Sequence, residues 1–244
     1  MPIRVTIWNE FRHEKKKESV AALYPNGIHA YIRDFLQCDE VSVTLAALDD
    51  PECGLPDEVL NNTDVLMWWG HVAHNEVPFS LVDKIERRVR NGMGIVFLHS
   101  AHKSRPFQRI VGCTGNLLWG KTQRAIVWNL APTHPITKGV PAHFELQEEM
   151  YGEPFFIPKP EEVIFGTWFE QGNLFRGGVT FLRGLGRIFY FHPGHESCTS
   201  FYNENVQTVI KNAVRWCAPT VLAEGFDNEK CFEQKQPVFE SDKS

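Results

Sequence analysis

Three short apolar runs that end directly in a histidine constrain the fold of this chain more than any other feature of its sequence. The runs are Met67-Trp68-Trp69-Gly70-His71, Val96-Phe97-Leu98-His99 and Phe189-Tyr190-Phe191-His192. Near-continuous apolar runs of this length are typical of strands that are covered on both faces. They predict a buried sheet with a histidine at the carboxyl end of each of three strands.

Helical and strand patterns alternate through the first half of the chain. Strands are expected at 3–8, 41–48, 65–69 and 94–98, and helices at 27–36, 78–90 and 104–111. This alternation predicts βαβ units and a mostly parallel sheet. In the second half, strands are expected at 123–129, 143–147, 162–167, 178–183 and 187–191, followed by a helix at 203–217. We expect one α/β domain over residues 1–218 and a C-terminal arm or tail over residues 219–244.

Composition excludes several classes of protein. The net charge is −5, with no basic stripe for nucleic acid, and no apolar run is long enough to span a membrane. The N-terminus lacks the apolar region of a signal peptide. The six cysteines form no Cys-x-x-Cys pair, which is typical of reduced thiols. We therefore expect a cytoplasmic protein with neither a nucleic-acid nor a membrane partner.

Six of the 10 histidines form three His-x-x-His pairs, 71/74, 99/102 and 192/195. Composition alone would produce about 0.4 such pairs. In an open α/β sheet, ligands bind outside the carboxyl ends of the strands. If their strands are neighbours in the sheet, we expect His71, His99 and His192 to converge on one cleft, with Asn9 and Glu10 at its rim.

Three imidazoles around one cleft can serve several chemistries. Neutral imidazole is a common ligand of transition metals, so His71, His99 and His192 are candidate ligands of a divalent metal, zinc first. Metal-free acid–base catalysis and sugar binding are the alternatives, as is a purely structural role. The nearby carboxylates that could complete the site are Glu10, Glu148, Glu149 and Glu196.

Five segments of the chain resemble the ThuA-like trehalose-utilisation family. They are Trp8-Asn9-Glu10-Phe11-Arg12-His13-Glu14, Tyr24-Pro25-Asn26-Gly27-Ile28-His29, Trp68-Trp69-Gly70-His71-Val72-Ala73-His74, Leu98-His99-Ser100-Ala101-His102 and Phe191-His192-Pro193-Gly194-His195-Glu196. The resemblance implies a flavodoxin-like three-layer sandwich, similar to class I glutamine amidotransferases. It also implies a role in the use of sugars, around trehalose and keto-sugars.

The comparison with amidotransferases also shows two departures. Those enzymes carry a nucleophilic cysteine on the turn where this chain has His99, and imidazole cannot form the required thioester. Their glutamate lies two residues after the histidine of Phe-His-Pro, where this chain has Gly194. Glutamine hydrolysis is therefore disfavoured.

Two functions from different classes are open. The first is an enzyme, a hydrolase, isomerase or lyase, acting on a sugar or keto-sugar; the second is a non-catalytic sugar-binding or regulatory protein. For the enzyme, the expected acid–base residues are His99, Glu10, Glu149 and His195. The residues expected to contact the carbohydrate ligand are Asn9, His29, His74, His102 and Trp69. We also expect a homo-oligomer.

Overall fold

The computed structural model describes residues 1–222. Its centre is a nine-stranded sheet with the strand order β2-β1-β3-β4-β9-β8-β7-β5-β6. The predicted α/β class is confirmed. The expected arm over residues 219–244 lies almost wholly outside the described residues.

The first five strands in this order are parallel. They are β1 (Ile3–Asn9), β2 (Val41–Ala47), β3 (Val65–Trp69), β4 (Gly94–Leu98) and β9 (Gly186–Phe191). An order in which the first strand lies between the second and third is that of flavodoxin-like sheets. All five carboxyl ends therefore lie at one edge of the sheet, where the histidines follow.

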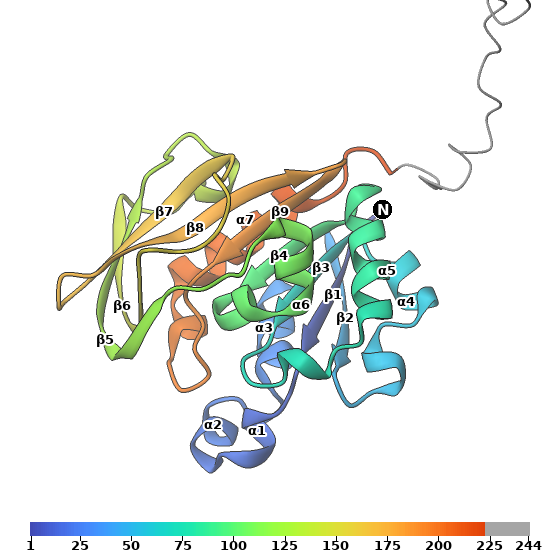
Figure 1. Cartoon of the computed structure of the whole chain (residues 1–244), viewed down its shortest axis with the longest axis horizontal. Coiled ribbons are helices and arrows are strands. Elements are labelled where there is room, and N and C mark those ends of the chain that lie inside the picture. Colours follow the sequence, from blue (N-terminus) through green and yellow to red (C-terminus); the bar gives the residue numbers. More distant parts are fainter. Residues whose placement is uncertain (223–244) are drawn as a thin grey trace, which may run out of the picture.

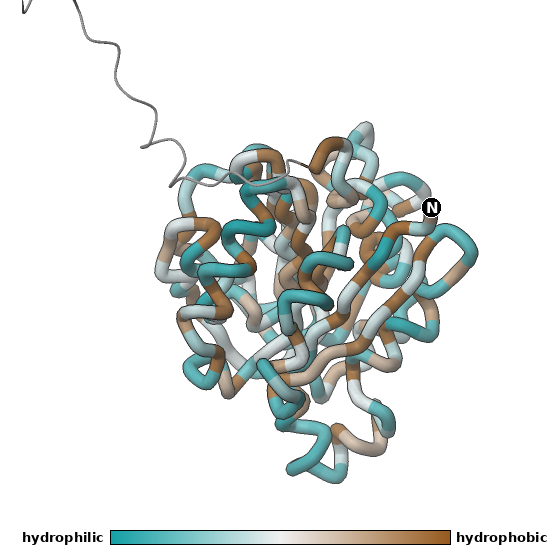
Figure 2. Tube along the Cα trace, turned by 90° about the vertical axis from the view of Figure 1, so that its right-hand side faces the viewer, coloured by the Kyte–Doolittle hydropathy of each residue, from teal (hydrophilic) through white to brown (hydrophobic). Residues whose placement is uncertain are grey.

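Helices cover both faces of the parallel strands. On one face lie α3 (Ile28–Leu36) and α7 (Glu204–Cys217), which share a core with Val5 and Ile7 of β1. On the other face lie α4 (Asp57–Asn61) and α5 (Phe79–Arg90), which share a core with Trp8. Successive residues of a strand point to opposite faces, so both faces of a wholly apolar strand are buried. Figure 2 shows apolar segments concentrated in the central strands, whereas the outer helices alternate apolar and polar residues.

The remaining four strands are antiparallel. They are β5 (Leu118–Asn129), β6 (His143–Gly152), β7 (Glu162–Phe169) and β8 (Leu174–Arg183). Only Gly184 and Leu185 join β8 to β9, and parallel strands need a much longer crossover. The expected parallel sheet is thus confirmed for one half, and an antiparallel extension, at the left of Figure 1, forms the other.

Short helical segments account for most of the differences from the predicted elements. The polar stretch after β1 forms α1 (His13–Lys16) and α2 (Glu18–Leu23), which project below the body in Figure 1. The helix expected at 104–111 is α6 (Arg105–Phe107) continued by the wider turn η4 (Gln108–Gly112). Such elements are too short to show a helical period. The other single turns are η1 (Pro51–Gly54), η2 (His74–Glu76), η3 (His99–Lys103), η5 (Pro135–Thr137) and η6 (Ser200–Tyr202).

None of the helices within residues 1–222 combines the length and the hydropathy needed to cross a membrane.

Candidate functional site

The strands β3, β4 and β9 are neighbours, and each carries a histidine just beyond or at its carboxyl end. The ring centroids of His71 and His99 lie 5.9 Å apart, and those of His99 and His192 lie 5.7 Å apart. His99 has a φ of 50°, in the left-handed region that a non-glycine residue adopts only when its surroundings hold it there. The structure therefore brings the three residues to one edge of the sheet, with His99 on a strained turn between the other two.

His99 donates a hydrogen bond from each of its nitrogens. Its Nδ1 lies 2.9 Å from the carbonyl oxygen of His192, and its Nε2 lies 3.1 Å from Oε2 of Glu149. A carbonyl oxygen can only accept, so Nδ1 carries a proton, and a proton on Nε2 is stabilised by the carboxylate of Glu149. Burial alone would lower the pKa of His99, but the Glu149 hydrogen bond and the charges of Glu148 and Glu149 raise it above the ordinary value.

His71 is held by a different carboxylate. Its Nδ1 lies 2.8 Å from Oε2 of Glu196, which leaves the lone pair of Nε2 available in the neutral ring. Lys17 adds a contact of 3.1 Å to the other oxygen of Glu196. Burial alone would raise the pKa of Glu196, but its hydrogen bond with His71 and the nearby histidines hold it well below the usual range. Glu196 is therefore ionised, and it orients His71.

His195 lies between these two pairs. Its ring centroid is 5.4 Å from that of His71 and 5.2 Å from that of His99. Its Nε2 lies 3.5 Å from Glu196 and 3.9 Å from Glu149. Burial lowers the pKa of His195 to about 4, so the ring is neutral at neutral pH.

Solvent reaches the cluster through only a few side chains. His71 is 25% exposed, and Glu149 and His195 are 13% exposed each, whereas the His99 side chain is 0% exposed. A ligand would therefore meet His71, Glu149 and His195, and His99 would act from behind Glu149.

Two buried carboxylates hold the loops that carry these histidines. Glu10 accepts hydrogen bonds from the backbone amides of Val72 and Ala73, each at 2.9 Å. Glu148 accepts from the amide of Gly194 at 2.7 Å and from the Ser200 hydroxyl at 2.6 Å. The oxygens of Glu10, which we expected to act as an acid or base, are thus engaged by the loop after β3.

His192 and His102 are buried supports in this structure. The Nε2 of His192 donates to the carbonyl oxygen of Glu149 at 2.9 Å, and burial holds the pKa of His192 well below its ordinary value. The Nδ1 of His102 donates to the carbonyl oxygen of Gly115 at 2.6 Å, and burial lowers its pKa to about 3. Both rings are therefore neutral.

The other residues expected to contact a ligand lie around the site. Asn9 donates to Glu14 at 2.7 Å and lies 3.0 Å from Nδ1 of His29, and all three side chains are buried. Trp69 is fully buried, and its indole donates to the carbonyl oxygen of Gly194. His74 is partly exposed, and burial of its ring lowers its pKa to about 4.

The structure adds three residues that sequence reasoning did not select. His13 and Lys17 both approach Glu196, at 3.5 and 3.1 Å. Tyr151 lies 3.3 Å from Nε2 of His99. The spacing of four residues between His13 and Lys17 was a usable signal, because it puts both side chains on one side of a helical turn.

Two groups of side chains bring potential metal-ligating atoms within 4.8 Å of one another, His13 with His71 and Glu196, and His71 with Glu149 and His195. Of the three predicted ligands, only His71 belongs to either group. His99 differs because its two nitrogens are engaged by the carbonyl oxygen of His192 and by Glu149. In the second group, His71 donates its Nδ1 proton to a carboxylate, which is how metal-bound histidines are commonly oriented. These residues therefore fit a divalent transition metal better than the predicted set does.

Comparisons with known proteins agree with this architecture. A family model described as trehalose utilisation (ThuA) matches residues 4–217. No curated protein matches the chain. A ThuA-like protein from Parabacteroides merdae superposes with a TM-score of 0.66 at 15% identity, covering 92% of this chain and 93% of that one. A ThuA-like protein from Bacteroides uniformis gives 0.63 at 19% identity, covering 88% and 91%. A glutamine amidotransferase from Thermotoga maritima gives 0.50 at 12% identity, covering 79% and 75%. The expected amidotransferase-like fold is thus confirmed.

Proposed function

The chain belongs to the trehalose-utilisation (ThuA) family, and from this premise we propose that it is an enzyme that transfers protons on a sugar or keto-sugar. Membership of the family supports a role with carbohydrates. The observation that carries the catalytic part is the pairing of two histidines with two separate carboxylates, with the rings of His71 and His99 5.9 Å apart.

The two pairs hold their protons differently. Glu196 fixes the proton of His71 on Nδ1, so Nε2 can accept a proton from a substrate. The pair of Glu149 and His99 holds a proton between the two groups, which it can deliver to a substrate oxygen at Glu149. A group that can accept a proton beside a group that can deliver one is the usual arrangement for general acid–base catalysis.

A keto-sugar suits this arrangement because its carbonyl acidifies the adjacent C–H bond. In the proposed step, Nε2 of His71 takes that proton, the electron pair moves toward the carbonyl carbon, and the carbonyl oxygen receives a proton from the Glu149–His99 pair. The product is an enediol. Return of a proton to the other carbon gives isomerisation, and loss of a neighbouring alkoxide gives a lyase reaction.

Deuterium exchange tests this step whichever product the reaction forms. Trehalose, glucose and their keto derivatives would be incubated with the protein in D₂O, and the C–H signals next to the carbonyl followed by NMR. We expect the wild type to exchange such a proton and His71→Gln to lose the exchange. Glu145→Gln changes an exposed carboxylate elsewhere on β6 and should retain it. Sugar binding without exchange or conversion would instead support the non-catalytic alternative.

A second version of the site uses a metal. His71, Glu149 and His195 would hold a divalent transition metal, zinc first, because their ligating atoms lie within 4.8 Å of one another. A metal there would polarise a carbonyl oxygen. Metal analysis of protein purified without an affinity tag tests this version, which predicts one bound metal ion that is lost in His195→Gln. A preparation free of metal, with a thermal midpoint that neither zinc nor chelator shifts, would contradict it.

We also propose that the protein works in the cytoplasm on a small carbohydrate ligand. Within residues 1–222, all five cysteines have free thiols. Free thiols persist in a reducing compartment. Fractionation of the cells that make the protein tests this location, and recovery outside the cytoplasm would contradict it.

A further inference from the structure

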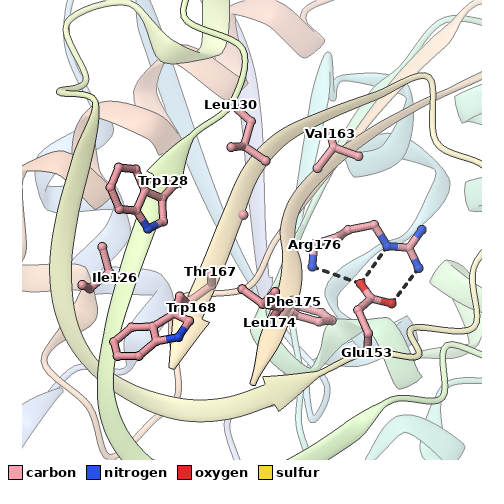
Figure 3. A pocket seen from close by; sticks show the side chains of 11 residues that line it. Ile126, Trp128, Leu130, Glu153, Val163, Thr167, Trp168, Leu174, Phe175 and Arg176 are labelled. Atoms are coloured by element: carbon pink, nitrogen blue, oxygen red, sulfur yellow. Dashed lines mark hydrogen bonds and ion pairs between the residues drawn. The ribbon is translucent and has the colours of Figure 1, made fainter. Parts of the chain in front are cut away.

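The antiparallel half of the sheet carries a hollow of about 550 Å³ that the proposed chemistry does not use. Eleven residues line it: Ile126, Trp128, Leu130, Glu153, Val163, Gly166, Thr167, Trp168, Leu174, Phe175 and Arg176. Figure 3 shows the two indole rings on one side and the pair of Arg176 and Glu153 on the other. We call this surface the β5–β8 face.

The strand register explains why apolar side chains gather on the β5–β8 face. Ile126 of β5 is paired with Trp168 of β7, which is paired with Leu174 of β8, so all three side chains point to the same side of the sheet. Gly166 lies opposite Trp128 and lines the hollow. A Cβ at this position would lie 3.0 Å from Leu130, so the absence of a side chain keeps this part of the hollow open. The hollow is thus a consequence of the register and of one glycine.

Much of this apolar surface is open to water. Leu174 is 62% exposed, Leu130 is 56% exposed and Trp128 is 45% exposed. Clustered exposed side chains of this kind mark interaction sites more often than single exposed ones do. The three protrude around the same hollow, so the face presents both projections and a cavity.

The charged groups on this face already neutralise one another. Arg176 donates to Glu153 at 2.7 and 2.9 Å, and Glu153 also accepts from two backbone amides. Arg124 and Glu145 form a second two-bond pair on the same side of β5 and β6. A partner that covered these four residues would therefore leave none of their charges without a partner.

The apolar character and the compensated charges of the β5–β8 face indicate what binds to it. A sugar needs polar groups that are free to bind its hydroxyls, and the carboxylate of Glu153 is already engaged. We infer that the β5–β8 face binds the same face of a second copy of this chain, as a twofold dimer. A twofold interface requires a surface that complements itself, and the projecting leucines beside the hollow meet that requirement.

The hollow supplies part of the surface that a stable dimer needs. A stable interface involves about 20 to 30 residues on each side. The hollow supplies eleven, and the outward-facing residues of β5 and β6 that flank it, including Arg124, His143 and Glu145, extend the same surface. β6 is the edge strand of the described sheet, so within residues 1–222 no further strand lies beside it.

Sedimentation equilibrium of the full chain over a range of concentrations tests the inference. We expect the wild type to have the mass of a dimer at micromolar concentration. In Leu174→Asp, a carboxylate would be buried in the apolar interface, and we expect the dissociation constant to rise by more than 100-fold. Leu185→Asp is the matched control, since Leu185 is 49% exposed in the turn beyond the far end of β8, and it should stay dimeric.

Circular dichroism would first establish that each variant is folded. If Leu174→Asp does not fold, Leu130→Asp serves the same test, because Leu130 projects beside the same hollow. A monomeric wild type or a Leu174→Asp variant that dimerises like the wild type would overturn the inference. So would equal dissociation of the Leu174→Asp and Leu185→Asp variants. Saturable quenching of Trp128 fluorescence by a sugar in a monomeric protein would assign the hollow to a ligand instead. Sedimentation does not depend on catalysis, so failure of the dimer inference can be distinguished from failure of the proposed function.

Discussion

Glu196 and His71 are separated by 125 residues of sequence, yet Oε2 of the one lies 2.8 Å from Nδ1 of the other. Glu196 follows β9 and His71 follows β3, and only β4 lies between these strands in the sheet. The contact determines which nitrogen of His71 carries the proton. It therefore decides whether the nitrogen on the opposite side of the ring can act as a base.

Glu196→Gln should weaken the base while keeping the shape of the side chain. The neutral amide no longer stabilises the positive charge that His71 gains when it accepts a proton. We expect kcat for the exchange reaction to fall by about 100-fold, within the range for general acid–base groups. The exchange assay in D₂O measures this loss, with Glu145→Gln as the control. Wild-type kcat in Glu196→Gln would remove His71 from the role of base.

The protonation of His99 should depend on Glu149. We expect an NMR titration of the imidazole signals to show a raised pKa for His99 in the wild type and a lower pKa in Glu149→Gln. Activity should decline as the pH rises through the raised pKa, because the deliverable proton is then lost. An unchanged His99 titration in Glu149→Gln would show that the carboxylate does not hold this proton.

The same protonation also has a consequence for stability. A pKa that is higher in the folded chain means that the imidazolium stabilises the fold. This contribution is complete below the ordinary histidine pKa of about 6.5 and is lost as the pH rises through the folded value. We expect the free energy of unfolding of the wild type to fall as the pH rises through the pKa of His99 in the folded chain. In Glu149→Gln, we expect this fall to be smaller.

Glu148→Gln should destabilise the fold even though the volume of the side chain is kept. Oε2 of Glu148 accepts from the amide of Gly194 and the hydroxyl of Ser200, and Oε1 accepts from the amides of Glu149 and His195. The NH2 end of a glutamine can only donate, so it would lose one of these two sets of hydrogen bonds. We expect the free energy of unfolding to fall by about 2 to 3 kcal/mol, as for lost hydrogen bonds to a charged group. Urea unfolding measures this change. Glu161→Gln, at an exposed position just before β7, should change it by less than about 0.5 kcal/mol.

Acid should destabilise the protein through its buried neutral histidines. The pKa values of His102 and His195 are lowered to about 3 and about 4, whereas the unfolded chain binds these protons below about 6.5. Unfolding therefore takes up protons as the pH falls from about 6.5 to 4, and each such histidine costs about 1.4 kcal/mol per pH unit. Protonation of His99 changes the stability in the opposite direction, but it is one histidine against two.

Urea unfolding at pH 6.5 and pH 5.0 measures this acid sensitivity. We expect a loss of at least about 3 kcal/mol in the wild type between these values, and a smaller loss in His102→Asn. His143→Asn serves as the control because His143 is exposed. Equal losses in all three proteins would contradict the assignment of the effect to buried imidazoles.

Sequence reasoning recovered most of the elements but only part of the site. Strand and helix periods are local, so the runs that end at His71 and His99 could be located from the residues alone. The role of Glu10 could not, because a carboxylate that holds a backbone loop has the same sequence appearance as one that faces a ligand. His13 and Lys17 were not selected because their spacing shows a shared side but not that Glu196, 179 residues later than Lys17, approaches it.

The sequence by itself determined that histidines stand at the ends of three buried strands, because apolar periodicity and strand termination depend on adjacent residues. That these three strands are neighbours was decided by the order of the strands in the folded sheet. Only the tertiary structure decided how those histidines are protonated. That property depends on which carboxylate approaches which ring and on how deeply each is buried, and both are set by contacts between distant segments. The pairing of His71 with Glu196 and of His99 with Glu149 therefore distinguishes a candidate base from a candidate acid where the sequence showed equivalent residues.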